Sequence, residues 1–212
     1  MICRQCRGIE KFFDEGEAKK DFRKYRKSGP SRTTQALVEA IKAQGIEGKS
    51  LLDIGGGVGV IQHELLRIGV SSSVGVDAST AYIAAAKDEA RRQGHADRIS
   101  AHHGDFVDLA DDIQTADIVT MDRVICCYHD MEQLVGLSCQ RSASLYGLVY
   151  PRETWVARLE FGLFNLYMWL RRNPFRVFVH PTAAVDSLIR RNGFEQRFSL
   201  KTMVWQVVLY GR

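Results

Sequence analysis

The sequence predicts an α/β protein built on a doubly wound, mostly parallel sheet with a closing antiparallel hairpin. Short apolar strands alternate with helical segments from residue 50 onward, and a glycine-rich turn joins the first strand to its helix. The 212 residues are 45% hydrophobic, so the chain can bury a sizeable core and is not a disordered chain. We therefore expect one main domain with short additions.

Residues 1–45 are expected to form an N-terminal helical arm. A highly charged run with a few aromatic anchors, residues 9–28, predicts one exposed helix, because a glycine and a proline follow it directly. Ser31 or Thr33 can cap a second helix, which reaches to about Gln44 and stops at the next glycine.

Residues 46–212 are expected to form the main domain. Its first five strands are the segments LLDI, SVGVD, ISAHHGD, ADIVTMDRVI and SLYGLVYP. The fourth segment is continuously apolar, as is typical of a strand covered on both faces. After the fifth strand the alternation breaks, and we expect a helical insertion over about 152–176. A helix over 182–192 and a hairpin over 194–210 complete the prediction.

Charge and cysteine content narrow the class of protein. The chain has 29 Lys and Arg against 25 Asp and Glu, a mild basic bias, and its basic clusters are dispersed. We therefore expect no nucleic-acid partner. Five cysteines give no disulfide framework, which favours a reducing, cytoplasmic compartment. No secretory signal is visible, and no charge-free apolar run is long enough to span a bilayer.

The strongest motif is DIGGGVG, residues 53–59, which leaves a strand and opens a helix. Glycines allow a tight turn and a close approach to a ligand, and the helix N-terminus offers free N–H groups. The dinucleotide spacing Gly-x-Gly-x-x-Gly fails, because Val60 stands where its third glycine would fall. The motif fits the pattern (Asp/Glu)-x-Gly-x-Gly-x-Gly instead.

Over roughly residues 45–150 the chain resembles the class I S-adenosylmethionine-dependent methyltransferases. Besides the glycine loop, Asp77 ends the second strand and Asp105 ends the third. The resemblance implies a Rossmann-like fold, with S-adenosyl-L-methionine as cofactor. It assigns cofactor binding to Asp53, Gly55, Gly56, Gly57, Gly59, Asp77, Ala78, Asp105, Phe106 and Asp122. As alternatives, the acids are ordinary turn residues, or the fold binds the ligand without catalysis.

In that family the individual roles are distinct. Asp53 and the glycines would bind the amino-acid portion of the cofactor, and Asp77 would accept the ribose hydroxyls. Asp105 and the N–H of Phe106 would read the adenine. The chain lacks both the Asn/Asp-Pro-Pro-Tyr/Phe motif of nucleic-acid amino methylation and a Pro-Cys nucleophile. We therefore expect methyl transfer to a small or medium organic substrate, at oxygen.

Beyond the core, the layout resembles the magnesium-protoporphyrin IX O-methyltransferases more loosely. The arm carries Tyr25, a Tyr-Pro-Arg stretch closes the fifth strand, and an aromatic-rich helix follows. This resemblance implies a tetrapyrrole propionate as methyl acceptor, with Tyr25, Arg152 and Trp155 as substrate-binding residues. A propionate is ionised at neutral pH and needs no general base. Alternatives are an unrelated small molecule, or a non-catalytic adenosyl-binding partner subunit.

The family places His-Tyr after the fourth strand, where this chain has Cys-Cys-Tyr-His-Asp. The catalytic candidates are therefore Cys126, Tyr128 and His129, although His129 could equally be a loop residue. We expect no metal, and the pair Cys3 and Cys6 more often marks a terminus than a zinc site. Residues 155–176 could line the pocket, form an interface or make a peripheral membrane contact, and the oligomeric state stays open.

Overall fold

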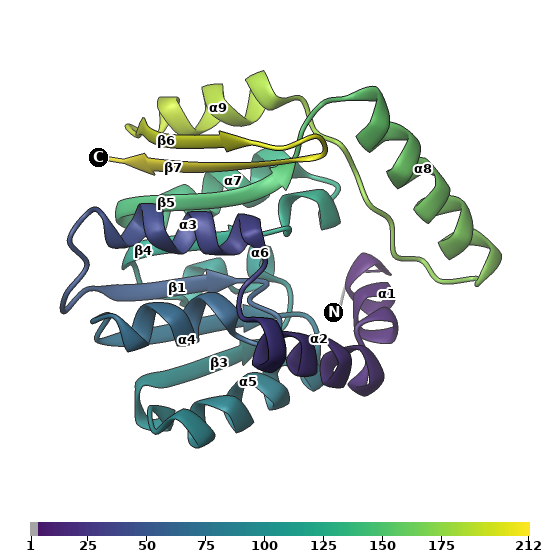
Figure 1. The fold of residues 1–212 in the computed structure, drawn as a ribbon. Helices are drawn as coiled ribbons and strands as arrows, with labels where there is room; N and C mark the ends of the chain where they lie inside the picture. Colours follow the sequence, from purple (N-terminus) through teal and green to yellow (C-terminus); the bar gives the residue numbers. More distant parts are fainter. Residues whose placement is uncertain (1–3) are drawn as a thin grey trace.

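Seven strands form one sheet in the computed structural model, which describes residues 4–212 (Figure 1). The strands are β1 (Ser50–Ile54), β2 (Ser72–Asp77), β3 (Ile99–His103), β4 (Ala116–Asp122), β5 (Ser142–Pro151), β6 (Glu195–Lys201) and β7 (Trp205–Gly211). Their order is β3-β2-β1-β4-β5-β7-β6. The first five in this order are parallel, and β7 runs antiparallel to both of its neighbours. The expected fold class is confirmed.

The strand order reverses direction at β1, which pairs with β2 on one side and β4 on the other. In open α/β sheets such a switch point leaves a crevice at the carboxyl ends of the strands. The register places Asp53 beside Gly75 on β2 and Thr120 on β4. The acid of the glycine motif therefore stands at the centre of the sheet.

Helices cover both faces of the sheet (Figure 1). They are α1 (Arg4–Phe12), α2 (Glu15–Ser28), α3 (Arg32–Lys42), α4 (Val60–Arg67), α5 (Thr80–Gln93), α6 (Phe106–Leu109), α7 (Met131–Gln140), α8 (Trp155–Leu170) and α9 (Thr182–Arg191). Short 3-10 turns are η1 (Ala96–Arg98), η2 (Ala110–Asp112) and η3 (Ile125–Cys127). On one face α3 and α4 bury Leu37, Ile41 and Leu65, and on the other α7 and α9 bury Leu134 and Ile189.

Two sequence-based boundaries differ from the structure, and one choice left open by the sequence is decided. The single helix expected over residues 9–28 is two helices, because Asp14 caps α2 by accepting hydrogen bonds from the N–H groups of Gly16 and Glu17. Ser31 is the cap of α3, accepting from the N–H of Thr34. The strand expected to run through DRVI ends at Asp122, because the next residue has a φ of 62°.

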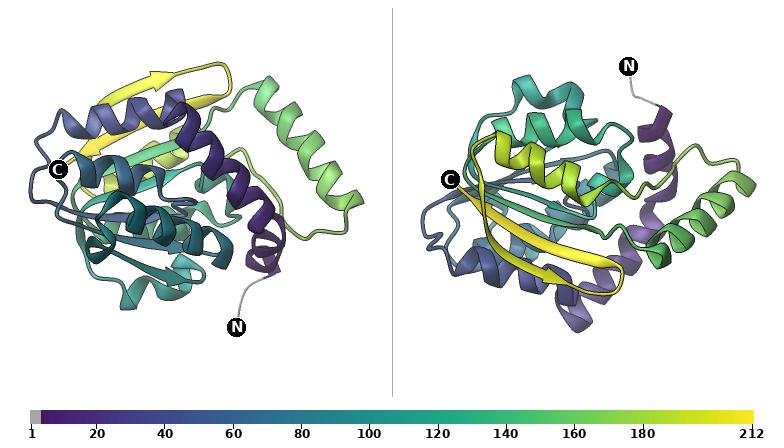
Figure 2. Two further views of the ribbon diagram at one scale, coloured as in Figure 1. Left: turned by 60° about the horizontal axis from the view of Figure 1, so that its bottom comes forward. Right: turned by 90° about the horizontal axis from the view of Figure 1, so that it is seen from above.

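The helices α1, α2 and α8 lie beyond the carboxyl edge of the sheet, with α8 standing out from the strands (Figure 2). The ring of Phe12 on α1 lies 5.5 Å from that of Phe164 on α8 and 5.6 Å from that of Phe175. A Cβ on Gly8 would lie 2.3 Å from the backbone nitrogen of Phe175, so only glycine allows this approach. These helices are therefore packed as a roof over the crevice.

Candidate active site

A cavity of about 640 Å³ opens at the carboxyl edge of the sheet, beneath the roof of α1, α2 and α8. Most of the residues expected to bind a cofactor line it together: Asp53, Gly55, Gly56, Gly57, Asp77, Ala78, Asp105, Phe106 and Asp122. Gly59 lies outside the lining. It precedes α4 with a φ of 79°, and a Cβ there would lie 2.9 Å from Nε2 of His63. Its role is to start the helix.

The glycine loop passes close beneath the segment that follows β4. Gly55 has a φ of 63°, and a Cβ on it would lie 2.5 Å from a methyl group of Val124. Further along, the N–H of Gly57 donates a hydrogen bond of 3.0 Å to Oδ2 of Asp77. This bond ties the loop after β1 to the end of β2, so the two motif residues form one wall of the cavity.

Asp53 supports the loop from below. Its carboxylate is buried and accepts hydrogen bonds from Oγ1 of Thr120 at 2.7 Å and from Nε2 of Gln62 at 3.3 Å. A Cβ on Gly56 would lie 2.4 Å from Oδ2 of Asp53, so the loop rests directly on this group. Burial raises the pKa of Asp53 to about 7.

The other two motif acids lie at the ends of their strands. Asp77 also accepts a hydrogen bond of 2.8 Å from the N–H of Ser79, and burial raises the pKa of its carboxyl. Asp105 caps α6 through its Oδ1. Its Oδ2 accepts hydrogen bonds from the hydroxyl of Tyr128 at 3.1 Å and from the thiol of Cys6 at 3.3 Å. The roof helix α1 therefore reaches the expected adenine-binding acid.

Asp122 at the end of β4 has one satisfied and one unsatisfied oxygen. Its Oδ2 accepts a hydrogen bond of 2.5 Å from Oγ1 of Thr34. Within residues 4–212 its Oδ1 is buried without a hydrogen-bond partner, and Nη1 of Arg123 lies 3.8 Å away. Burial raises the pKa of Asp122. Asp122 therefore lines the cavity with one carboxylate oxygen whose hydrogen-bonding capacity is unused among the described residues.

Arg123 lines the cavity and was missed by the sequence analysis. Its φ of 62° is unusual for a non-glycine residue and turns the chain out of β4. Its Nη2 donates to the hydroxyls of Ser31 at 2.9 Å and Thr33 at 2.8 Å, and its guanidinium lies 5.1 Å from the ring of Trp205. A cation directly after the acid that ends β4 is the signal that could have revealed it.

Of the three catalytic candidates, Cys126 and Tyr128 line the cavity and His129 does not. The ring of His129 stacks on that of Tyr128 at 5.2 Å. The neighbouring thiol of Cys127 and burial raise the pKa of Cys126 well above its usual range, so it remains a thiol at neutral pH. The structure therefore does not bring these residues together as a base and a nucleophile.

The three residues expected to bind substrate are spread apart. Tyr25 lines the cavity, but its hydroxyl donates to Oε1 of Glu64 at 2.7 Å. Arg152 lies outside the lining and donates to the carbonyl of Thr202 at 2.7 Å. Trp155 is 76% exposed on the outer side of α8. That helix instead presents other side chains to the cavity, namely Glu160, Phe161 and Phe164.

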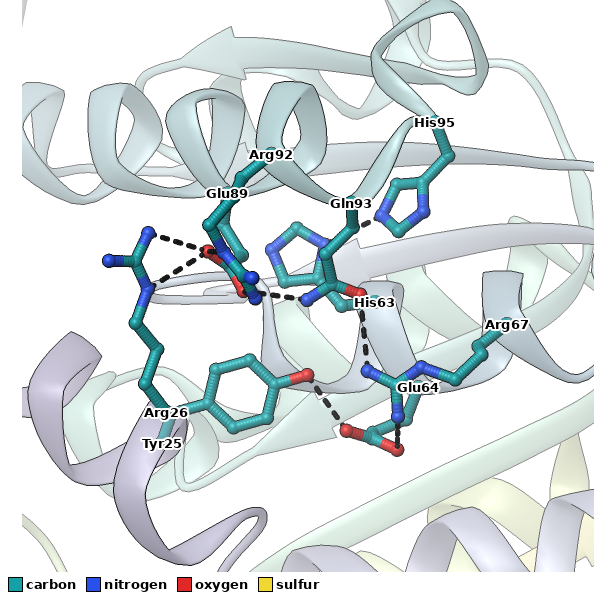
Figure 3. A network of polar contacts seen from close by, with 9 residues as sticks. All are labelled: Tyr25, Arg26, His63, Glu64, Arg67, Glu89, Arg92, Gln93 and His95. Atoms are coloured by element: carbon teal, nitrogen blue, oxygen red, sulfur yellow. Dashed lines mark hydrogen bonds and ion pairs between the residues drawn. The ribbon is translucent and has the colours of Figure 1, made fainter.

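A network of polar contacts holds α2 on α4 and α5 (Figure 3). Glu89 on α5 is buried and accepts hydrogen bonds from Arg26 at 3.0 Å and from its own-helix neighbour Arg92. Tyr25 stacks on His63 with ring centroids 6.2 Å apart. Nδ1 of His63 lies 3.0 Å from Nε2 of His95, and burial lowers the pKa of His63 to about 4.

The upper part of the cavity is aromatic. The rings come from α1 and the residue after it, α8, the segment after α8, and β7: Phe12, Phe13, Phe161, Phe164, Phe175 and Trp205. Two cations, Lys24 and Arg123, also line the cavity. Such a mixture of aromatic walls and a few charged groups is typical of a site for an organic molecule with anionic substituents.

Residues 4–212 lack two features that would change the interpretation of the site. No helix in this range is long and apolar enough to cross a membrane. No group of three or more His, Cys, Asp or Glu side chains in the same range is placed to hold a metal ion. Cys3 lies outside the described residues, so the pair that it forms with Cys6 in the sequence is not described.

Sequence comparisons point to one domain type. Residues 51–140 match the family described as a methyltransferase domain. The ribosomal protein L11 methyltransferase of Enterobacter sp. (strain 638) is 29% identical over 92 residues, 43% of this chain and 30% of that protein. The corresponding protein of Aliivibrio fischeri (strain MJ11) is 32% identical over 75 residues, 35% of this chain and 26% of that protein. The chain thus spans less than a third of these curated relatives.

Solved structures match over more of the chain. The magnesium protoporphyrin IX methyltransferase from Synechocystis PCC 6803 with bound SAH has a TM-score of 0.74 and 16% identity, over 98% of this chain and 99% of that one. An O-methyltransferase family protein from Burkholderia thailandensis has a TM-score of 0.64 and 17% identity, over 85% of this chain and 56% of that chain. These likenesses show a shared fold, in the first case over nearly the whole of both chains.

Proposed function

We propose that this chain, whose residues 51–140 match a methyltransferase domain, is an S-adenosylmethionine-dependent methyltransferase that acts on an oxygen of a flat, carboxylated organic molecule. The observation that carries this proposal is a cavity lined by the glycine loop, its acids, a group of aromatic side chains and two cations. The methyl donor and its acceptor can therefore lie in one cavity.

The residues present fit S-adenosylmethionine. The loop over Asp53 would hold its amino-acid portion, Asp77 the ribose, and Asp105 with Phe106 the adenine. The Oδ1 of Asp122 has no hydrogen-bond partner within residues 4–212, so this cavity-lining carboxylate keeps unused acceptor capacity. When bound, the cofactor supplies an electrophilic methyl group on a sulfonium.

The acceptor is inferred from the roof. The aromatic side chains offer apolar surface to a planar ring system, and Lys24 and Arg123 can pair with its carboxylates. A tetrapyrrole propionate, as in magnesium-protoporphyrin IX, meets both requirements. The structural likeness that spans nearly all of both chains supports this finer proposal.

A carboxylate acceptor also agrees with the positions of the catalytic candidates. A propionate is ionised at neutral pH, so no proton has to be removed before it attacks the methyl group. His129 lies outside the cavity lining, and the raised pKa of Cys126 keeps it a neutral thiol. In this proposal the protein aligns the two reactants and excludes water.

Two alternatives are less well supported: a protein as the methyl acceptor, and a subunit that binds the cofactor without catalysis. A ribosomal protein is the acceptor in the printed names of the curated relatives, but those matches cover only the core of the domain. The roof of α1, α2 and α8 encloses the cavity and favours a small molecule over a protein surface. A non-catalytic adenosyl-binding subunit remains the alternative that a turnover measurement must test.

The test uses purified protein, S-adenosylmethionine and magnesium-protoporphyrin IX, with metal-free porphyrin and a phenol in parallel. Mass spectrometry should detect S-adenosylhomocysteine together with a porphyrin methyl ester. Asp77→Ala should abolish the product, whereas Asp88→Ala, at an exposed position of α5, should not. Turnover of the phenol alone would refute the carboxylate proposal. Cofactor binding without turnover of any acceptor would favour the non-catalytic subunit.

A further inference from the structure

The helix α8 turns a large apolar face to solvent. Its exposed side chains, 48–76% accessible, are Trp155, Leu159, Leu163, Leu166, Tyr167, Trp169 and Leu170. The spacing from Trp155 through Leu159, Leu163 and Leu166 to Leu170 is three or four residues at each step, so these five form one stripe along the helix. We call this set of five residues the outer stripe.

The opposite face of α8 is already used within the protein. Ala157, Phe161 and Met168 are buried, and Phe161 with Phe164 lines the cavity. α8 also stands out from the sheet at one end of the molecule, so its other side is open to a large surface (Figures 1 and 2). The side chains of the outer stripe are therefore not used for packing within the described residues.

Charged residues border the outer stripe, and the two that follow its C-terminal end are cations. These are Arg171 and Arg172, which are exposed, and Arg171 lies 5.8 Å over the ring of Tyr167. Arg158 is exposed and pairs with Glu153 at 2.7 Å. The helix α8 contains one acid, Glu160, which is exposed and also lines the cavity.

We propose that α8 docks the protein on an anionic phospholipid bilayer, with the outer stripe inserted at the interface and Arg171 and Arg172 against the lipid phosphates. Tryptophan and tyrosine side chains suit this boundary, because they combine an apolar ring with a polar group. An amphipathic helix with cations at its border binds such a surface without spanning it. The inference does not depend on the identity of the methyl acceptor.

Charge complementarity favours an anionic lipid surface as the occupant. Arg171 and Arg172 lie next to each other directly after α8, and within residues 4–212 neither is in an ion pair with a carboxylate. Anionic headgroups supply the counter-charge that these two arginines lack within the described residues.

The test is flotation of the full chain with vesicles of phosphatidylcholine alone or of equal parts phosphatidylcholine and phosphatidylglycerol. The chain should float with the anionic vesicles, and added salt should weaken binding. Leu163→Glu should lower the partition coefficient at least about tenfold. Arg171→Gln combined with Arg172→Gln should lower it about tenfold on anionic vesicles only.

The matched control is Ala84→Glu, which adds the same charge at an exposed position of α5. It should bind vesicles like the unaltered chain, and circular dichroism melting should show that all variants are folded. Absence of binding to anionic vesicles, or an equal loss in Ala84→Glu, would overturn the proposal. So would a concentration-dependent dimer that Leu163→Glu dissociates without lipid, since the stripe would then be a protein interface.

Discussion

The hydroxyl of Tyr25 donates a hydrogen bond of 2.7 Å to Oε1 of Glu64, which fastens the roof helix α2 to α4 beside the glycine loop. Burial and this bond raise the pKa of Tyr25 to about 12, so the phenol stays protonated and keeps donating at neutral pH. A residue expected to bind substrate thus uses its hydroxyl to hold the roof.

Tyr25→Phe should lower the free energy of unfolding by about 1–2 kcal/mol, because Glu64 loses a donor in a half-buried site. Urea denaturation measures the change. Tyr167→Phe is the matched control, since this exposed residue should change stability by less than about 0.5 kcal/mol. Equal losses in both variants would show that the bond to Glu64 does not secure the roof.

Glu89 should make the protein sensitive to acid. Hydrogen bonding from Arg92 holds the pKa of Glu89 at about 2, below its value in the unfolded chain. A lowered pKa contributes stability above the unfolded value, and that contribution is lost as the pH falls toward 2. Glu89→Gln should therefore lose about 1–3 kcal/mol near pH 7 and less near pH 3, as measured by thermal melting. Exposed Glu132→Gln should show no such difference.

The stability that Asp53 contributes should change with pH in the opposite direction to that of Glu89. Because burial raises its pKa to about 7, the folded protein holds this proton more tightly than the unfolded chain. That stability is fully present at acid pH and is lost as the pH rises from about 4 to about 7. Burial raises the pKa values of Asp77 and Asp122 in the same sense.

Asp53→Asn should therefore stabilise the ligand-free protein near pH 8 by about 1–3 kcal/mol, with a smaller gain near pH 5. The amide can keep the bond from Thr120, and a flip of Gln62 would offer its unpartnered Oε1 to the new NH₂ group. Urea denaturation at several pH values measures this. A variant whose difference from the unaltered protein is the same at pH 5 and pH 8 would contradict the assignment.

Asp77→Ala should weaken binding of S-adenosylhomocysteine more than about tenfold, because the ribose would lose charge-assisted hydrogen bonds. The N–H of Gly57 also loses its acceptor, which loosens the loop. Isothermal titration calorimetry measures the affinity, with Asp88→Ala as the exposed control. Unchanged affinity in Asp77→Ala would refute its role as the ribose-binding acid.

Arg123 and Arg152 form a matched pair for the acceptor site. Arg123→Gln should raise KM for a carboxylated acceptor about tenfold and leave cofactor affinity largely unchanged, because Arg123 is one of the two cationic residues that line the cavity. Arg152→Gln should change KM much less, since that side chain binds the carbonyl of Thr202 outside the lining. If steady-state kinetics showed a larger rise in KM for Arg152→Gln than for Arg123→Gln, Arg152 would be the substrate-binding residue, as expected from the sequence.

The succession of strands and helices along the chain, and most of the residues that line the cavity at the edge of the sheet, could be predicted from the sequence. The signals are local: Asp53 and its glycines are contiguous, and Asp77 and Asp105 each follow an apolar strand. Parallel strands bring their carboxyl ends to one edge, so local positions determine which residues meet there. The break at Asp14 was missed because its capping hydrogen bonds stop a charged helix that composition alone would continue.

The roof and the acceptor side of the cavity were decided only by the tertiary structure. Whether Arg123 or Arg152 faces the cavity depends on a φ of 62° at the end of β4 and on contacts with Thr33 and Trp205, far away in the sequence. The two faces of α8 are both apolar, so periodicity could not tell which one is buried. Local chain chemistry thus determined the cofactor loop, whereas packing between distant segments determined what the cavity can admit.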